Sequence, residues 1–390
     1  MSLDKKIDAE KVLAWRRHLH RHPEVGYAER ETTAYIEKEL KAYPGIEIRR
    51  PTPTGLVAVL KGGPGPVVGL RADIDALPIQ EEADVPFRSA NDGAMHACGH
   101  DCHAAMLLGA ADLLHSRRGA LGGTVKLIFQ HAEEVPPGGA SELCASGLLN
   151  DVQAFYGAHV FVSKPAGTIM TAAGHIFANT DNFDIAIQGK GTHAARPECG
   201  IDSLLVGAQV VQALNNIVSR QVSPFSEAVV TVGAFNSGSI HNVVPDTAKI
   251  MGTVRTYDKE LHAKIQSSIK ALTEGICQGH GAACTVEFGG GYDCVYNSEA
   301  LHGFFNKAAK KHLPAIQIAE MLPLMGGEDF GEYSKIAPSY FASIGGMPKG
   351  GAVYGGHHPK FEIDEDCLPI GAALYAAFAL EIMESGVPGQ

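Results

Sequence analysis

Residues 95–106 read MHACGHDCHAAM, and the organisation of the whole chain can be worked out from this stretch. The nine residues from His96 to Ala104 hold three histidines, two cysteines and an aspartate, and burying so many polar groups without partners is costly. Cys98 and His100 supply a thiolate and an imidazole on either side of a glycine that permits a tight turn. Both ligands suit zinc and neighbouring metals. The alternative is a half-buried loop before a helix that we expect to begin near His103.

Composition indicates an ordinary globular protein. The chain has 390 residues, of which 45% are hydrophobic and 19% charged, so two domains of typical composition are expected. The formal net charge of -11 argues against a nucleic-acid or anionic-membrane partner, because either would favour a basic face. No stretch approaches about 18 consecutive apolar residues, so we expect no membrane-spanning helix.

The N-terminus and the cysteines predict the cellular compartment. Residues 1–6, MSLDKK, lead directly into an expected charged helix, which is not typical of a signal peptide. The eight cysteines are irregularly spaced and favour free thiols with a metal ligand among them over disulfides. We therefore expect a cytoplasmic protein.

The N-terminal third alternates helical patterns with short apolar runs, which predicts an α/β domain. The third expected strand, Val67–Arg71, is followed by Asp73 and Asp75, at the position where open α/β sheets place their sites. Two solvated loop acids are the alternative. The other expected elements are helices at Lys5–His22 and Glu29–Tyr43 and strands at Ile46–Arg49 and Gly55–Leu60.

A second pair of carboxylates follows the apolar strand expected over Thr124–Gln130. Glu133 and Glu134 repel one another as anions, so a cation or a shared proton is needed to hold both in place. One can bind a metal while the other moves protons, as a metallohydrolase requires; a solvated pair at a loop start is the alternative. His159 lies in the next expected strand, Phe155–Val160, where a lone histidine is more often a satisfied core residue.

From about Asp181 the pattern changes to that of a small inserted domain. Its elements follow the order strand-helix-strand-strand-helix-strand of a ferredoxin-like unit. We expect a discontinuous domain, 1–180 and 295–390, interrupted by residues 181–294. The inserted elements are expected at Phe183–Gln188, Asp202–Arg220, Ala228–Phe235, Ala248–Thr256, Glu260–Gly279 and Cys284–Phe288, and the later ones at Ser298–His312, Ser339–Ile344 and Cys367–Met383.

Motifs spread in order over nearly the whole chain carry a resemblance to a known family. They are RRHLH at 16–20 with PE at 23–24, LRADIDALP at 70–78, MHACGHD at 95–101, EE at 133–134, GAHV at 157–160, GKGTHAARP at 189–197, HNVVPD at 241–246, GEDF at 327–330 and HHPKF at 357–361. The chain resembles the N-acyl-amino-acid amidohydrolases, the branch of the metal-dependent aminoacylase and carboxypeptidase family that includes hippurate hydrolase and the plant auxin-conjugate hydrolases. The resemblance implies an α/β fold: a mixed-sheet, metallo-exopeptidase-like catalytic domain with an inserted ferredoxin-like α+β lid domain through which subunits dimerise.

The resemblance also implies the site. It assigns two divalent metal ions per subunit to Cys98, His100, Glu134, His159 and His357, and the catalytic carboxylate to Glu133. This donor set suits zinc, with manganese, cobalt or nickel as alternatives. Next to His357 the family usually has a small polar residue, and here that place is His358, which could compete as the ligand.

The remaining assignments concern the substrate. His193 matches the histidine that stabilises the oxyanion from a partner subunit; without the resemblance it is a surface-loop residue. Asn242 and Arg255 match positions that hold the substrate's α-carboxylate, which a guanidinium binds with two parallel bonds, although Arg255 alone reads as an exposed strand residue. Asp75 fits a role in orienting a ligand or a neighbouring backbone group. Asp73 stands where the carboxypeptidase branch has a ligand histidine, which favours the amidohydrolase branch.

The sequence therefore predicts an enzyme that hydrolyses a small-molecule N-acyl amino acid to a carboxylic acid and an amino acid. It is expected to be a homodimer or a larger homo-oligomer, with neither nucleic acid nor membrane as a partner. A metallo-dipeptidase or carboxypeptidase of the same family is the first alternative. A thiol hydrolase with Cys98 as its nucleophile and a non-catalytic metal-binding protein are the others.

Overall fold

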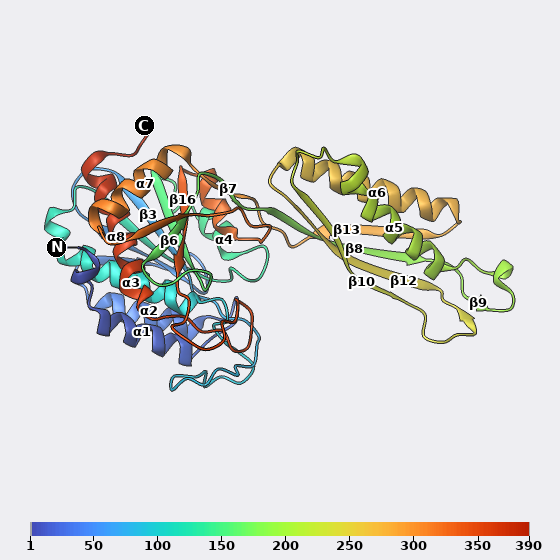
Figure 1. Cartoon of the computed structure of the whole chain (residues 1–390), viewed down its shortest axis with the longest axis horizontal. Helices are drawn as coiled ribbons and strands as arrows, with labels where there is room; N and C mark the ends of the chain where they lie inside the picture. Colours follow the sequence, from blue (N-terminus) through green and yellow to red (C-terminus); the bar gives the residue numbers. More distant parts are fainter. Residues whose placement is uncertain (1, 390) are drawn as a thin grey trace. The chain divides into compact units, whose positions relative to one another are not determined.

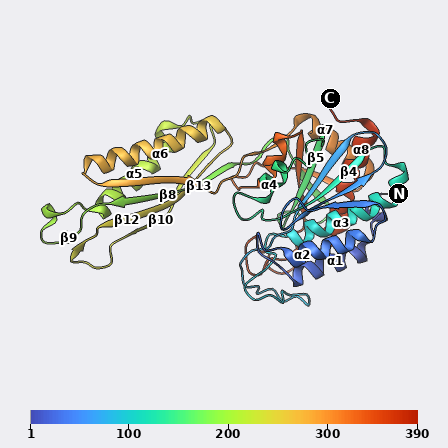
Figure 2. The same ribbon diagram turned by 180° about the vertical axis from the view of Figure 1, so that it is seen from behind.

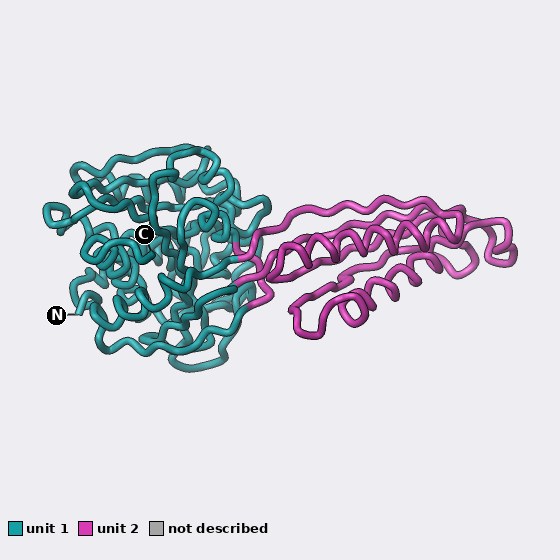
Figure 3. Tube along the Cα trace, turned by 90° about the horizontal axis from the view of Figure 1, so that it is seen from above, with its two compact units in different colours: residues 1–176, 295–323, 329–390 teal, residues 177–294, 324–328 magenta. Residues whose placement is uncertain are grey.

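The structure is a computed structural model that describes residues 2–389. The chain forms two compact units, and each is described by itself. Unit 1 comprises residues 1–176, 295–323 and 329–390, and unit 2 comprises residues 177–294 and 324–328 (Figure 3).

Unit 1 is built on a mixed sheet of eight strands (Figure 1). In spatial order they are β1 (Ile46–Arg49), β2 (Leu56–Lys61), β4 (Thr124–Gln130), β3 (Val67–Asp73), β5 (Ala154–Phe161), β16 (Ser339–Gly345), β6 (Thr168–Thr171) and β15 (Gln317–Glu320). The four central strands, β4, β3, β5 and β16, run parallel, whereas β2 and β6 flank them in antiparallel register. The predicted α/β fold with a mixed sheet is confirmed.

Helices cover both faces of this sheet, and its central strands are therefore buried along nearly their whole length. One face packs in a single apolar core against α1 (Ala9–Arg21), α2 (Arg30–Lys41), α3 (His100–Ser116), α7 (Glu299–His312) and α8 (Cys367–Ser385). The short helix α4 (Gly139–Ala145) and the 3₁₀ helix η4 (Asp329–Lys335) pack on the other face (Figure 2). Two more 3₁₀ turns are η1 (Asp4–Lys6) and η2 (Arg118–Ala120).

Helix α8 is apolar around most of its circumference because it lies inside unit 1. Among the described residues it is the one helix whose length and composition would suit a membrane span, and 72% of its most apolar window is buried. The sequence analysis predicted this helix, at Cys367–Met383, but no segment suited to span a membrane. Burial against α3 and the sheet accounts for its composition, as for the core helix of a globular domain.

Unit 2 has ferredoxin-like order and topology. Its strands β8 (Asn179–Gln188), β10 (Ala228–Ser237), β12 (Thr247–Thr256) and β13 (Ala283–Gly289) form an antiparallel sheet in the order β10-β12-β8-β13. Helices α5 (Ser203–Gln221) and α6 (Lys259–Gly279) pack together on one face (Figures 1 and 2). The smaller elements of this unit are β9 (Thr192–His193), which pairs with β11 (Val243–Val244), and η3 (Pro197–Cys199). The short strands β7 (Gly174–Phe177) and β14 (Val295–Asn297) pair with one another and belong to unit 1 except for Phe177.

The observed elements differ from the sequence predictions at one functionally important boundary. Helix α3 begins at His100 and not near His103, so the predicted ligand His100 lies in its first turn. The sequence analysis also missed most of the short elements, among them β6, β15, α4 and η4, which have between four and seven residues each. Runs of that length carry little periodicity to detect.

Candidate metal centre

The candidate site lies at the edge of the unit 1 sheet where the four parallel strands end. Strand β3 leads to Asp75, β4 leads to Glu133 and Glu134, His159 lies near the end of β5, and His357 follows β16. Parallel strands end at one edge of a sheet, so residues far apart in the sequence meet there.

The N-terminus of α3 adds Cys98 and His100 to this edge. Gly99 between them has a φ of 86° and is the N-cap of the helix, a left-handed conformation that favours glycine. A Cβ atom on Gly99 would lie 2.5 Å from Cγ2 of Val160. Glycine therefore allows the turn to pack closely on β5 and fixes both side chains beside it.

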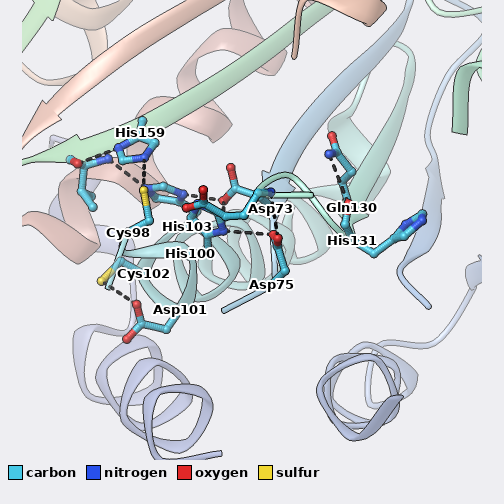
Figure 4. A network of polar contacts seen from close by, with 12 residues as sticks. Asp73, Asp75, Cys98, His100, Asp101, Cys102, His103, Gln130, His131 and His159 are labelled. Carbon is cyan, nitrogen blue, oxygen red and sulfur yellow. Dashed lines mark hydrogen bonds and ion pairs between the residues drawn. The ribbon is translucent and has the colours of Figure 1, made fainter. Parts of the chain in front are cut away.

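The five predicted ligand residues form one cluster, of which Figure 4 shows Cys98, His100 and His159. Sγ of Cys98 lies 3.2 Å from Nε2 of His159. Oε1 of Glu134 lies 3.2 Å from Nε2 of His357 and 3.9 Å from Nε2 of His100. All five residues therefore meet within unit 1.

Their donor atoms form overlapping triplets of the size that a metal ion requires. One donor atom each of Cys98, His100 and His159 lies within 4.8 Å of the other two, and the same holds for Cys98, Glu134 and His357. Donors at about 2.0–2.3 Å from a zinc ion lie within about 4.6 Å of each other. Because Cys98 belongs to both triplets, its thiolate fits between two ions.

Two buried donor atoms of the cluster make no hydrogen bond of good geometry within residues 2–389. They are Nε2 of His100 and Oε1 of Glu134. Buried polar atoms are nearly always paired, so a cation facing both atoms fits the site. Asp75 orients His100 and Glu134. Its Oδ1 lies 3.1 Å from Nδ1 of His100, and its Oδ2 accepts the Glu134 backbone N–H at 3.0 Å.

Charges in the cluster favour the protonated form of two of its histidines, His357 and His100, whereas burial lowers the pKa of His159 well below its usual value. The Cys98 thiol and the Glu134 carboxylate raise the pKa of His357 to about 10. Burial disfavours a charge on His100, but Asp73 and Asp75 with Cys98 raise its pKa well above the usual range. Ligands must be deprotonated to coordinate a metal, so metal binding would displace these protons.

A buried chain of polar contacts behind the ligands was not predicted (Figure 4). Arg71 Nη1 donates to Asp73 at 2.7 Å, and the other Asp73 oxygen lies 2.5 Å from Nδ1 of His103. Nε2 of His103 accepts the Val160 N–H at 2.9 Å, while the Val160 carbonyl lies 2.7 Å from Nδ1 of His159. These contacts leave Nε2 of His159 facing Cys98. The sequence did contain one indication of these contacts, because Arg71 is a charged residue inside an otherwise apolar strand.

Glu133 is buried, and one of its carboxylate oxygens belongs to a triplet with donors of His100 and Glu134. The residue before it, Ala132, has a φ of 49°. Its N–H donates to Oε1 of Glu29 at 2.7 Å. Glu29 was not among the predicted site residues.

The structure places His357, and not His358, in the cluster. His357 has a φ of 67°, and its N–H donates to the Ala97 carbonyl at 2.8 Å. The His358 ring stacks on Tyr354, with 4.3 Å between ring centroids, and its Nδ1 accepts the Lys360 N–H.

The three predicted substrate-contacting residues of unit 2 lie at two ends of that unit. His193 is exposed in β9 and pairs with Val243, and the Ala194 N–H donates to the carbonyl of Asn242, so His193 and Asn242 are neighbours. Arg255 lies near the other end of β12, where Nη1 donates to the Met325 carbonyl at 2.8 Å.

Comparison with known proteins places the chain among metallopeptidase relatives. Residues 69–381 match the peptidase family M20/M25/M40. The chain is 39% identical over 378 residues to an N-acetylcysteine deacetylase of Bacillus subtilis (96% of this chain, 97% of the relative). It is 36% identical over 386 residues to thermostable carboxypeptidase 2 of Saccharolobus solfataricus (96% and 97%).

A solved structure agrees with these relatives. The Bacillus subtilis YXEP protein, described as a dinuclear metal-binding peptidase, superposes with a TM-score of 0.83 at 36% identity, covering 97% of this chain and 99% of that one. The resemblance inferred from the motifs is thereby confirmed, and the chain belongs to the peptidase family M20/M25/M40.

Proposed function

We propose that the protein is a metal-dependent amidohydrolase that cleaves N-acyl amino acids to a carboxylic acid and a free amino acid. The observation that carries the proposal is the buried Glu133 carboxylate beside the cluster of thiol, imidazole and carboxylate donors. The relative named as an N-acetylcysteine deacetylase supports the substrate class.

The proposed metal ligands are Cys98, His100, Glu134, His159 and His357, for two divalent ions per subunit. Zinc is the ion that a thiolate-containing N/O/S set favours, and manganese, cobalt and nickel are the alternatives that metal analysis would separate. Such ions polarise the amide carbonyl and lower the pKa of bound water. Asp75 supports the ligands through its contacts with His100 and Glu134.

Glu133 is the proposed general base and acid. A carboxylate at this place can take a proton from the attacking water and deliver it to the departing amine, a role that typically contributes about 10²–10⁴-fold to the rate. His193 is the proposed donor to the developing oxyanion. Asn242 and Arg255 are the proposed partners of the substrate carboxylate.

The arrangement of unit 2 supports a site shared between two subunits. The β9–β11 ladder adjoins the Thr247 end of β12, since Gly189 and Gly191 both donate to Asp246. Arg255 lies eight residues further along, about 26 Å at the usual rise per residue. One small substrate cannot reach both ends of one strand, so His193 and Asn242 would act on the site of a partner.

The same end of unit 2 carries exposed apolar side chains, which supports a homodimer formed through this unit. Leu204 and Val243 are 43% and 50% exposed, and Ile240 is 56% exposed. Val243 pairs with His193, so this exposed side chain adjoins the proposed oxyanion donor. Clustered exposed apolar surface is typical of a protein interface.

The carboxypeptidase relative supports a second candidate function with the same chemistry, the hydrolysis of unblocked peptides. Both candidates fit a cytoplasmic enzyme, because the eight cysteines, all within residues 2–389, form no disulfide there and reducing compartments keep thiols in that state.

The test is a panel of N-acetyl, N-benzoyl and other N-acyl amino acids beside unblocked dipeptides, with metal content measured on the same sample. Hydrolysis of the acylated compounds, lost on chelation and restored by added metal, is the expected result. Preference for dipeptides would select the second candidate. Activity that survives a chelator and is abolished by iodoacetamide would instead indicate Cys98 as a nucleophile.

A further inference from the structure

Glu29 is a fully buried carboxyl group that does not cap its own helix. It occupies the N-cap position of α2, where a side chain usually accepts a hydrogen bond from the first turn, but it makes no such bond. Glu24 does so in its place, because its Oε2 accepts the Thr32 N–H at 2.8 Å. The Glu29 side chain is thus directed to another partner.

That partner is the loop that carries Glu133. Oε1 of Glu29 accepts the Ala132 N–H at 2.7 Å. Ala132 has a φ of 49°, a region that residues other than glycine rarely occupy and that persists only where the surroundings hold it. The hydrogen bond holds the residue directly before Glu133 in this conformation.

A second buried carboxylate holds the other side of Glu133. Oδ2 of Asp75 accepts the Glu134 N–H at 3.0 Å, so Glu133 is the single residue between two anchored amides. The turn before Glu29 packs against the same loop, since a Cβ atom on Gly26 would lie 3.4 Å from both Cα of Ala132 and Oδ2 of Asp75.

We propose that Glu29 is a positioning residue that sets the direction of the Glu133 carboxylate through the Ala132 amide. The inference rests on the proposed function, in which Glu133 moves the protons. In this proposal Glu29 acts on Glu133 through the Ala132 amide. A misplacement of about 1 Å can cost on the order of 100-fold in rate, so loss of this hydrogen bond lowers kcat and leaves KM and metal content unchanged.

Three substitutions of Glu29 distinguish the effect of its acceptor position from the effect of its charge. Glu29→Gln keeps an acceptor oxygen at the same reach and should retain kcat within about threefold of the original protein. Glu29→Asp keeps the charge but moves the carboxylate away from the Ala132 amide by the length of one methylene, and Glu29→Met removes the acceptor. Both variants should lower kcat at least about tenfold. Glu24→Gln is the matched control, because it weakens the cap of α2 without touching the loop, and it should leave kcat unchanged.

Hydrogen exchange of the peptide containing residues 131–134 reports on the Ala132 amide independently of catalysis. It can also be measured for a variant that folds poorly. Exchange should accelerate in Glu29→Asp and Glu29→Met and not in Glu29→Gln. An unchanged kcat in all three variants, an aspartate that outperforms the glutamine, or losses explained by lost metal would each overturn the inference. If the original protein hydrolyses no N-acyl amino acid, the proposed function fails, whereas unchanged exchange rates would count against the Glu29 contact alone.

Discussion

At the scale of single residues, the site separates groups suited to bind a metal from one suited to move protons. Glu133 and Glu134 are adjacent in the chain, yet only Glu134 lies 3.2 Å from His357 and has its amide held by Asp75. Replacing Glu133 with glutamine keeps the size and removes the base. We expect Glu133→Gln to retain both metal ions and to lose activity by about 10³-fold. Metal analysis and steady-state kinetics check this, with the exposed Glu320→Gln as control; normal turnover would exclude Glu133 as the base.

Glu29 also gives a prediction for stability as a function of pH. Burial raises the pKa of Glu29 to about 7, and the Asp75 charge adds to this effect, whereas hydrogen bonds with its own backbone, the Ala132 amide and Thr54 oppose it. Because its pKa is higher in the folded state, the protonated form of Glu29 stabilises the folded protein. This contribution to the free energy of unfolding is fully present below about pH 4.5 and is lost as the pH rises through 7. The total is at most about 3 kcal/mol.

Glutamine cannot ionise, so the difference in melting temperature between Glu29→Gln and the original protein should increase from pH 5 to pH 8. The measurement is a set of thermal melts in the presence of chelator, so that metal binding does not contribute. Asp75 and Tyr27 are present in both proteins, so the comparison removes their own titration and retains only their interaction with the Glu29 charge. Parallel curves for the two proteins would contradict the raised pKa.

At the scale of elements, the start of α3 decides the geometry of two ligands. Gly99→Ala would place a Cβ atom 2.5 Å from Val160 Cγ2 and strain a φ of 86°, the latter at roughly 1–2 kcal/mol. We expect metal affinity to fall by about tenfold or more, as for other changes that reorient ligands. Gly93→Ala is the matched control, because its φ is 76° and its Cβ would meet nothing within 4 Å. Calorimetric titration with zinc would distinguish the two, and equal affinities would refute the packing argument.

The same scale shows how much the sequence could predict. Long periodic segments such as α5 and α6, and the apolar strand Thr124–Gln130, were predicted to within about two residues, because burial of one face imposes a period. Cys98 and His100 were predicted as ligands because polar ligand types crowd one short stretch, and both lie in the donor cluster. Glu29 and His103 were not found, since their role depends on backbone amides that come near only in the fold. The three-residue shift in the start of α3 arises because Gly99 ends the loop earlier than the polar pattern suggests.

At the scale of the whole molecule, the proposed sharing of sites between subunits can be tested by mixing variants. Glu133→Gln and His193→Ala should each be inactive alone. In a mixed dimer, one site would combine an intact Glu133 with an intact His193 from the other subunit. Random exchange of equal amounts should therefore restore about a quarter of the original activity. The double variant mixed with either single variant is the control, and no recovery despite subunit exchange shown by mass spectrometry would refute the arrangement.

The insertion of unit 2 within unit 1 has a consequence for biosynthesis. The ferredoxin-like elements of unit 2 are contiguous from β8 to β13 and can fold as soon as they leave the ribosome. The first 176 residues are translated earlier, but they lack β16 in the centre of their sheet and α8 on its face. A nascent polypeptide that has not reached His357 also lacks one of the five proposed donors, so we expect the complete donor set to assemble only after β16 and the loop that carries His357 have been translated.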